Sequence, residues 1–149
     1  MFVQYQELKI WQFSYDFVLN VYRAVENFPK HEDNNITSQL RRAATCLPLN
    51  IAEGSGARSP KIFLNYLIFA YRSSREIETL LLLARDLKYF SEGEYQELHG
   101  DLENFTKMLV SYMNYLEKDY IQNNRKKDLT HFYRQKKEGL VRKNFDSLS

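Results

Sequence analysis

The residues in this sequence most suited to chemistry are cations, and they gather toward the C-terminus. Residues 118–149 contain 9 Lys and Arg against 4 Asp and Glu, whereas residues 1–117 contain 12 against 15. A basic segment on a mildly acidic body often meets an anionic partner, such as a phosphate backbone. The candidate phosphate contacts are Arg58, Lys61, Lys118, Arg125, Lys126, Lys127, Arg134, Lys136 and Lys137.

Aromatic residues interleave with these cations. Stacking on nucleic-acid bases is a role open to Tyr120, Phe132, Tyr133 and Phe145, while neighbouring cations bind phosphates. The sequence pI of about 8.6 is nevertheless modest for a dedicated nucleic-acid binder. A solvated tail that binds nothing is therefore the alternative interpretation of the same residues.

A second group of polar residues follows one stripe of the segment 38–53, SQLRRAATCLPLNIAE. They recur every three or four residues, beside an apolar stripe of the same helix. A buried Arg42 would need a carboxylate partner, which Glu76 or Glu78 could supply. We expect a polar network that sets helix register or forms a subunit contact, and contact with a ligand or RNA is the alternative. Its members are Gln39, Arg42, Asn50, Glu53, Ser73, Glu76 and Glu78.

Catalytic and metal chemistry find little support in the sequence. Glu76 and Glu78 lie two positions apart on a helix, so their side chains point in different directions. None of the three histidines completes the Glu-x-x-His pattern of di-iron bundles. The turn that begins at Gly54 lacks the preceding strand and the following Gly-Lys-Ser/Thr of a phosphate loop, so we expect Gly54 to cap a helix. We expect no enzyme activity, no cofactor and no metal site.

These residues must be positioned by helices, because hydrophobic residues recur at helical spacing along most of the chain. Helices are predicted near residues 8–28, 38–53, 60–89 and 92–117, with boundaries marked by Pro29, Ser59-Pro60 and Ser91-x-x-Glu94. Asn35 or Thr37 can cap the second of them. Four amphipathic helices without strand signals predict an all-α fold, an antiparallel up-down four-helix bundle. We divide the chain into this bundle, residues 1–120, and a basic C-terminal extension, residues 121–149. The extension continues the fourth helix, forms a separate helix or is disordered.

The up-down arrangement also predicts where charge collects. The start of the first helix, the link between the second and third, and the end of the fourth meet at one end of such a bundle. All three carry Lys or Arg, whereas the opposite end is richer in Asp and Glu. A basic end would attract nucleic-acid backbones.

Composition is that of an ordinary soluble globular protein, with 44% hydrophobic and 27% charged residues. No apolar run approaches the roughly 18 residues of a membrane helix, and the N-terminal residues do not resemble a signal peptide. The single cysteine, Cys46, cannot form an internal disulfide and fits a reducing compartment. We expect a cytoplasmic protein that makes no contact with membranes.

The segment from Gln39 to Gly54 resembles a motif of a known bacterial family. It reads QLRRAATCLPLNIAEG, close to Q-L-R-R-A-x-x-S-x-P-x-N-I-A-E-G, with Cys46 in place of serine. On this motif the chain is similar to the four-helix bundle proteins encoded by intervening sequences of 23S rRNA genes, also described as S23 ribosomal proteins. Leu8 and Trp11 match the family's opening. The resemblance covers about residues 5–117, and its third-helix pattern aligns with Ala70, Arg72 (in place of glycine), Ser73, Glu76 and Glu78.

The resemblance carries expectations about assembly and partners. This family is similar in fold to the accessory variability proteins of diversity-generating retroelements, which are pentameric barrels of four-helix bundles that bind a reverse transcriptase and nucleic acid. It therefore implies a non-catalytic homo-oligomer, a pentamer, that binds RNA or DNA. The alternative it implies is an accessory subunit that binds a protein partner, for example a reverse transcriptase.

Overall fold

The computed structural model describes the backbone of residues 4–146 and the side chains of residues 4–131 and 134. Every secondary-structure element in that range is a helix. The four long helices are α1, Lys9–Ala24; α2, Ile36–Ser55; α3, Pro60–Asp86; and α4, Glu92–Asp146. Short 3-10 turns flank α1 at Tyr5–Glu7, Val25–Asn27 and Lys30–Glu32. The predicted all-α fold is confirmed.

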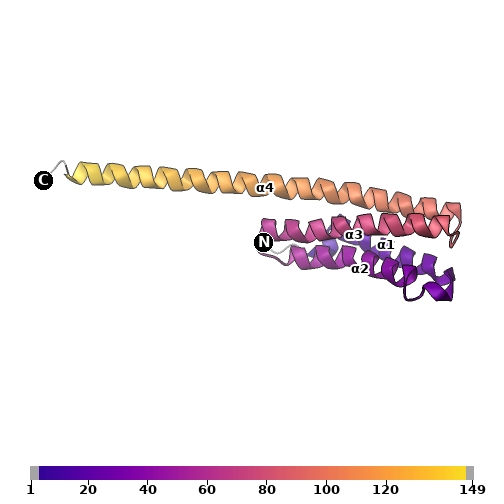
Figure 1. The fold of residues 1–149 in the computed structure, drawn as a ribbon. Helices are drawn as coiled ribbons and strands as arrows, with labels where there is room; N and C mark the ends of the chain where they lie inside the picture. The colour runs from indigo at the N-terminus through magenta and orange to yellow at the C-terminus, as the bar shows by residue number, and fades with distance from the viewer. Residues whose placement is uncertain (1–3, 147–149) are drawn as a thin grey trace.

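The helices form an antiparallel up-down bundle (Figure 1). Each helix packs on the next one in the chain, and α1 also packs on α4. The fourth helix is much longer than the others and continues past the end of the bundle where α2 ends and α3 begins (Figure 1). Because α4 has no break at residue 120, the C-terminal extension continues the fourth helix and projects from the bundle.

The core is built from one apolar face of every helix. Phe17 of α1, Leu47 of α2, Leu81 of α3 and Phe105 of α4 are all at most 1% exposed. Burying a side chain of this size contributes roughly 1.5–3 kcal/mol to stability. Away from these faces polar residues are mixed with exposed hydrophobic side chains such as Leu49 and Phe69. No helix within residues 4–146 is long and apolar enough to cross a membrane.

Local sequence signals explain two of the helix starts. Pro60 takes the first position of α3, where a missing backbone N–H is not needed for helix hydrogen bonds. At the start of α4, the Glu94 N–H donates to Ser91 Oγ at 3.1 Å and the Ser91 N–H donates to Glu94 Oε2 at 2.7 Å. This reciprocal pair is the predicted capping box. The first helix ends earlier than predicted, at Ala24, and the chain then passes through a 3-10 turn.

Gly54 does not cap α2, so that prediction is wrong. It is buried inside the last turn of α2, and Gly56 occupies the C-cap position. A Cβ atom at Gly54 would lie 2.6 Å from Phe63 Cδ2 and 2.7 Å from Tyr66 Cβ, both on α3. Glycine is therefore required because the two helices approach each other too closely for a side chain.

At the end of the bundle away from the projection, a polar cluster joins the α1–α2 link to the α3–α4 link. The Tyr89 hydroxyl donates to Glu32 Oε1 at 2.9 Å. Glu32 Oε2 accepts from Asn35 Nδ2 at 3.1 Å and from the Ile36 N–H at 3.3 Å. The hydrogen bond from Tyr89 lowers the pKa of Glu32, and the same bond raises the pKa of Tyr89. One buried carboxylate thus fastens both links.

Candidate nucleic-acid interface

The face of α4 that is buried in the bundle continues beyond it with the same helical spacing. Its residues change there from hydrophobic to polar and basic. Leu109 and Leu116, on the face that fills the core, are buried. Steps of three or four residues from Leu116 lead to Tyr120, Asn123, Lys127, Thr130 and Arg134. The face of α4 that packs into the core is therefore polar and basic where the helix leaves the bundle.

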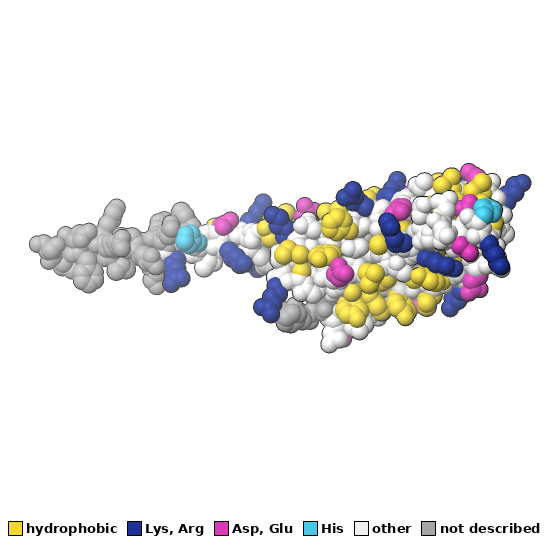
Figure 2. Space-filling model, turned by 60° about the horizontal axis from the view of Figure 1, so that its bottom comes forward, with side chains coloured by type: hydrophobic (Ala, Val, Ile, Leu, Met, Phe, Trp, Pro, Cys, Tyr) yellow, Lys and Arg dark blue, Asp and Glu magenta, His cyan; other side chains and the backbone are white. Residues whose placement is uncertain are grey.

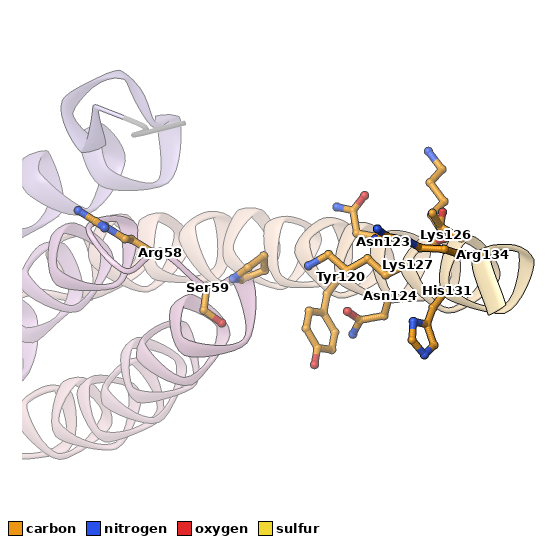
Figure 3. Close-up of a pocket in the computed structure, with 11 residues that line it drawn as sticks. Arg58, Ser59, Tyr120, Asn123, Asn124, Lys126, Lys127, His131 and Arg134 are labelled. Atoms are coloured by element: carbon orange, nitrogen blue, oxygen red, sulfur yellow. Dashed lines mark hydrogen bonds between the residues drawn. The ribbon is translucent and has the colours of Figure 1, made fainter. Parts of the chain in front are cut away.

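These five residues line a groove of about 700 Å³ beside the link between α2 and α3, which we call the basic groove. One wall comes from α4, and the other comes from residues 58–60 at the link. In Figure 3, Tyr120, Asn124 and His131 project from one side of α4, whereas Lys126 projects from the opposite side. The full lining is Arg58, Ser59, Pro60, Tyr120, Asn123, Asn124, Lys126, Lys127, Thr130, His131 and Arg134.

The charge of the basic groove favours anions. Among the described residues, its lining includes Arg58, Lys126, Lys127 and Arg134 and contains no Asp or Glu. All four cations are exposed to solvent. The N-terminus of α3 opens at the same place and adds the positive end of its helix dipole. Cations grouped around one groove suit phosphate groups.

Local hydrogen bonds orient the neutral side chains of this wall. The Asn123 Nδ2 donates to Asp119 Oδ2 at 3.1 Å, and the Thr130 hydroxyl donates to the Lys126 carbonyl at 2.8 Å. Both bonds join residues four positions apart on α4. They therefore order the helix surface without closing the groove.

A second cavity, of about 870 Å³, adjoins the basic groove on the side of the bundle. We call it the aromatic pocket, and it shares residues 58–60 and Asn123 with the basic groove. The rings of Phe63 and Tyr112 meet edge to face with centroids 5.7 Å apart, and the Tyr115 ring lies 6.1 Å from that of Tyr112. Burial raises the pKa of Tyr112, whereas Tyr115 is 62% exposed. The pocket thus combines a covered aromatic floor with one exposed ring.

The structure brings some of the sequence-predicted phosphate contacts together and separates others. Those that line the basic groove are Arg58, Lys126, Lys127 and Arg134. Lys61, Lys118 and Arg125 are exposed but do not belong to the lining. Of the predicted stacking residues, Tyr120 lies in the groove. The side chains of Lys136, Lys137, Phe132, Tyr133 and Phe145 lie outside the described residues.

Sequence reasoning missed five polar members of the groove. They are Ser59, Asn123, Asn124, Thr130 and His131. A usable signal was present for two of them, because extending the spacing of α4 past Leu116 places Asn123 and Thr130 on the face of Lys127. Ser59 has no such signal, since the path of the α2–α3 link brings it to the groove.

Lysines and arginines are not confined to this end of the molecule. Figure 2 shows them over the whole visible face, mixed with Asp and Glu on the bundle. In the bundle, Arg75 Nη1 lies 2.8 Å from Glu78 Oε2 and Arg85 Nε lies 3.0 Å from Asp86 Oδ1. The basic groove therefore differs from the bundle surface in the local grouping of its charges, not in having cations at all.

The predicted polar network is not buried. Four of its members, Gln39, Arg42, Glu53 and Glu76, are exposed, and Asn50, Ser73 and Glu78 are half-buried. Glu78 pairs with Arg75 and lies 3.8 Å from His99 Nε2, so it does not pair with Arg42. Gln39 and Asn50 form hydrogen bonds within α2 and its N-cap, to Asn35 and Cys46. The expected buried ion pair is wrong because the stripe faces solvent, and a subunit contact through it stays a prediction.

A third cavity, of about 480 Å³, lies between α1 and α2, and we call it the apolar groove. Its lining includes Tyr15 and Leu49, which are 47% and 57% exposed. Figure 2 shows hydrophobic side chains gathered on the face of the bundle that is turned toward the viewer. Exposed apolar surface of this kind often marks a protein contact.

The three cavities are lined by different kinds of side chain. Cations, amides, hydroxyls and aromatic rings line them. Within the described part of the chain, no group of three or more His, Cys, Asp or Glu side chains is placed to hold a metal ion.

Comparison with known proteins agrees with the fold and with the motif of α2. The profile of the family described as 23S rRNA-intervening sequence protein matches residues 6–111, which end before the basic groove of α4. A crystal structure of a protein with unknown function from the S23 ribosomal protein family of Bacteroides thetaiotaomicron has the same fold, with a TM-score of 0.63 and 24% identity over 70% of this chain and 97% of that one. No curated protein matches this chain. The chain belongs to the 23S rRNA-intervening sequence protein family.

Proposed function

We propose that this protein binds nucleic acid, RNA or DNA, through the basic groove and without catalysing a reaction. The observation that carries the proposal is the change of the core-facing side of α4 from Leu116, which is buried, to Lys127 and Arg134, which are exposed and line the groove. The described lining of the basic groove groups four cations and contains no Asp or Glu, an arrangement that solubility alone does not require. Family membership supports the proposal through the link to rRNA genes.

Phosphate contacts make a quantitative prediction about salt. Each neutralised phosphate releases bound counterions, so the logarithm of the binding constant falls linearly with the logarithm of the salt concentration. Replacing Lys126 and Lys127 with alanine removes two such contacts. The slope should become shallower by about 1.4 to 1.8.

A titration of fluorescently labelled oligonucleotides, followed by anisotropy at several salt concentrations, tests this. The matched control is the double variant Lys30→Ala/Lys107→Ala, which removes two exposed cations outside the basic groove. The control should keep the wild-type slope. Absence of binding by the wild type at low salt, or equal slopes for both double variants, contradicts the proposal.

We further propose that the protein is a homo-oligomer, a pentamer by family resemblance, and that it acts in the cytoplasm. The apolar groove supports self-association because Tyr15 and Leu49 would leave water in a contact between copies. Multi-angle light scattering measures the assembly directly. Leu49→Asp should shift the protein toward monomer, and since Leu49 is 57% exposed, the fold of each chain should survive the change.

The apolar groove also favours a second candidate function, an accessory subunit for a protein partner such as a reverse transcriptase. The two candidates use different surfaces and can be separated by variants. Co-purification with a reverse transcriptase encoded nearby should be lost in Leu49→Asp and kept in Lys126→Ala/Lys127→Ala. Loss in the lysine variant alone would favour an interaction bridged by nucleic acid.

A further inference from the structure

We propose that the ligand is single-stranded nucleic acid, with its phosphates in the basic groove and an unpaired base in the aromatic pocket. The inference rests on the proposed nucleic-acid function and narrows it to one class of ligand. It begins from the observation that the two cavities adjoin each other, because residues 58–60 and Asn123 line both of them. A nucleic-acid strand that lies along the basic groove would therefore pass the opening of the aromatic pocket.

The rings of the aromatic pocket are arranged to receive a flat group. Phe63 and Tyr112 are packed against each other, so they form a floor that does not need to move. Tyr115 stands beside them and is 62% exposed, which leaves much of its surface open to a ligand. Stacking between an aromatic ring and a nucleobase stabilises binding whatever the base, because every base has a π face.

The two cavities differ in charge, and this difference favours phosphates in the basic groove and a base in the aromatic pocket. The described lining of the basic groove holds four Lys or Arg and no carboxylate, whereas the aromatic pocket is lined by one carboxylate, Asp119, together with Arg58, which the two cavities share. Asp119 disfavours a phosphate in the part of the pocket that it lines, between Tyr115 and Asn123 along α4. Its carboxylate, or the amide of Asn123 bonded to it, can instead meet the polar edge of a base.

A duplex does not fit this arrangement. Its bases are stacked on one another and paired, so that only their edges reach the grooves. A ring such as that of Tyr115 can stack on a base only where the strand is single or the base is unstacked. Cations alone would bind single-stranded and duplex nucleic acid alike. The exposed ring of Tyr115 therefore carries the preference for the single strand.

The test uses the full chain and anisotropy titrations at one low salt concentration. The probes are a labelled single-stranded oligonucleotide of about 12 residues and the duplex of the same sequence, each made as RNA and as DNA. Wild type should bind the single strand more tightly, and Tyr115→Ala should weaken single-strand binding about 5- to 100-fold. Binding of the duplex should not change, and Tyr115→Phe should retain most of the affinity. A preference for one sugar would identify RNA or DNA as the source of the strand.

Phe69→Ala is the matched control, because Phe69 is a half-exposed aromatic residue of α3 that lines neither cavity. It should bind the single strand as wild type does. Equal affinity for both forms, or an unchanged Tyr115→Ala variant while Lys126→Ala/Lys127→Ala still weakens binding, overturns this inference and leaves the proposed function standing. Absence of binding to every probe overturns both.

Discussion

The two halves of α4 share one helix and one spacing but are held in place by different forces. Between Leu98 and Leu116 the helix is covered by the bundle, and side chains such as Phe105 and Leu109 are fully buried. Beyond Tyr120 the described side chains are mostly exposed, with Leu129 56% exposed. The first half is therefore stabilised by packing, and the second by the helix itself.

This difference shows that position on a helix face does not determine the role of a residue. Leu109 and Lys127 both lie on the side of α4 that points toward the bundle axis. Leu109 packs into the core. Lys127 lines the basic groove instead, because α3 begins at Pro60 and does not extend alongside this part of α4. The N-terminal end of α3 thus marks the change along α4 from core residues to groove residues.

The largest loss of stability should come from truncating a buried side chain in the packed half of α4. Leu109→Ala removes a fully buried side chain, and we expect it to lower the free energy of unfolding by about 3 kcal/mol. Leu129→Ala, the same change in the projecting half, should cost about 0.5 kcal/mol or less. Urea unfolding followed by circular dichroism measures both. Similar losses for the two variants would mean that the projecting half is packed in solution, for instance against another copy.

A smaller loss of stability is expected from a substitution at Gly54, where α2 and α3 approach each other closely. Gly54→Ala places a methyl group against Phe63 and Tyr66, and we expect a loss of about 1–3 kcal/mol from overpacking. Gly100→Ala is the control, because a Cβ there meets nothing within 4 Å. It lies inside α4 and should be neutral or stabilise the protein by up to about 1 kcal/mol. If both variants gained stability, close approach of α2 and α3 would not explain the glycine.

The smallest expected effect on stability comes from the hydrogen bond between Tyr89 and Glu32, at the end of the bundle opposite the projection. The pKa of Glu32 is lowered by its hydrogen bond from Tyr89, so the stability it contributes is present above the ordinary glutamate pKa of about 4.3 and is lost as the pH falls through the lower folded value. The pKa of Tyr89 is raised, so its contribution is present below about pH 10 and is lost at higher pH.

Tyr89→Phe removes this hydrogen bond and should lower the melting temperature at pH 7. The difference from wild type should shrink as the pH is lowered from 7 to 3. Thermal unfolding at these two pH values is the measurement. A difference that stays constant with pH would show that the bond to Glu32 contributes nothing measurable.

Much of the fold could be predicted from local patterns. The spacing of Leu98, Leu102 and Phe105 is enough to place one face of α4 in a core, and the capping box at Ser91 marks its start. The roles of Gly54 and Arg42 could not be predicted, because they depend on neighbours from another helix. A polar stripe beside an apolar one is compatible with burial or with solvent, and only the packed bundle decides between them.

The candidate site was predicted in part. Counting charges drew attention to Lys126, Lys127 and Arg134, but the groove exists because the α2–α3 link lies beside α4. That proximity follows from the lengths of α3 and α4 and from the path of the link, which no short motif encodes. The aromatic pocket escaped prediction for the same reason, since Phe63 and Tyr115 come from different helices.

The unbroken course of α4 has a mechanical consequence. At 1.5 Å per residue, the stretch after Leu116 extends for about 45 Å as one uninterrupted helix. A tilt of about 5° at its base would carry its tip through about 4 Å, by the geometry of a rod of that length. A small change in the angle at which α4 leaves the bundle would therefore move the far end of its backbone by several ångströms.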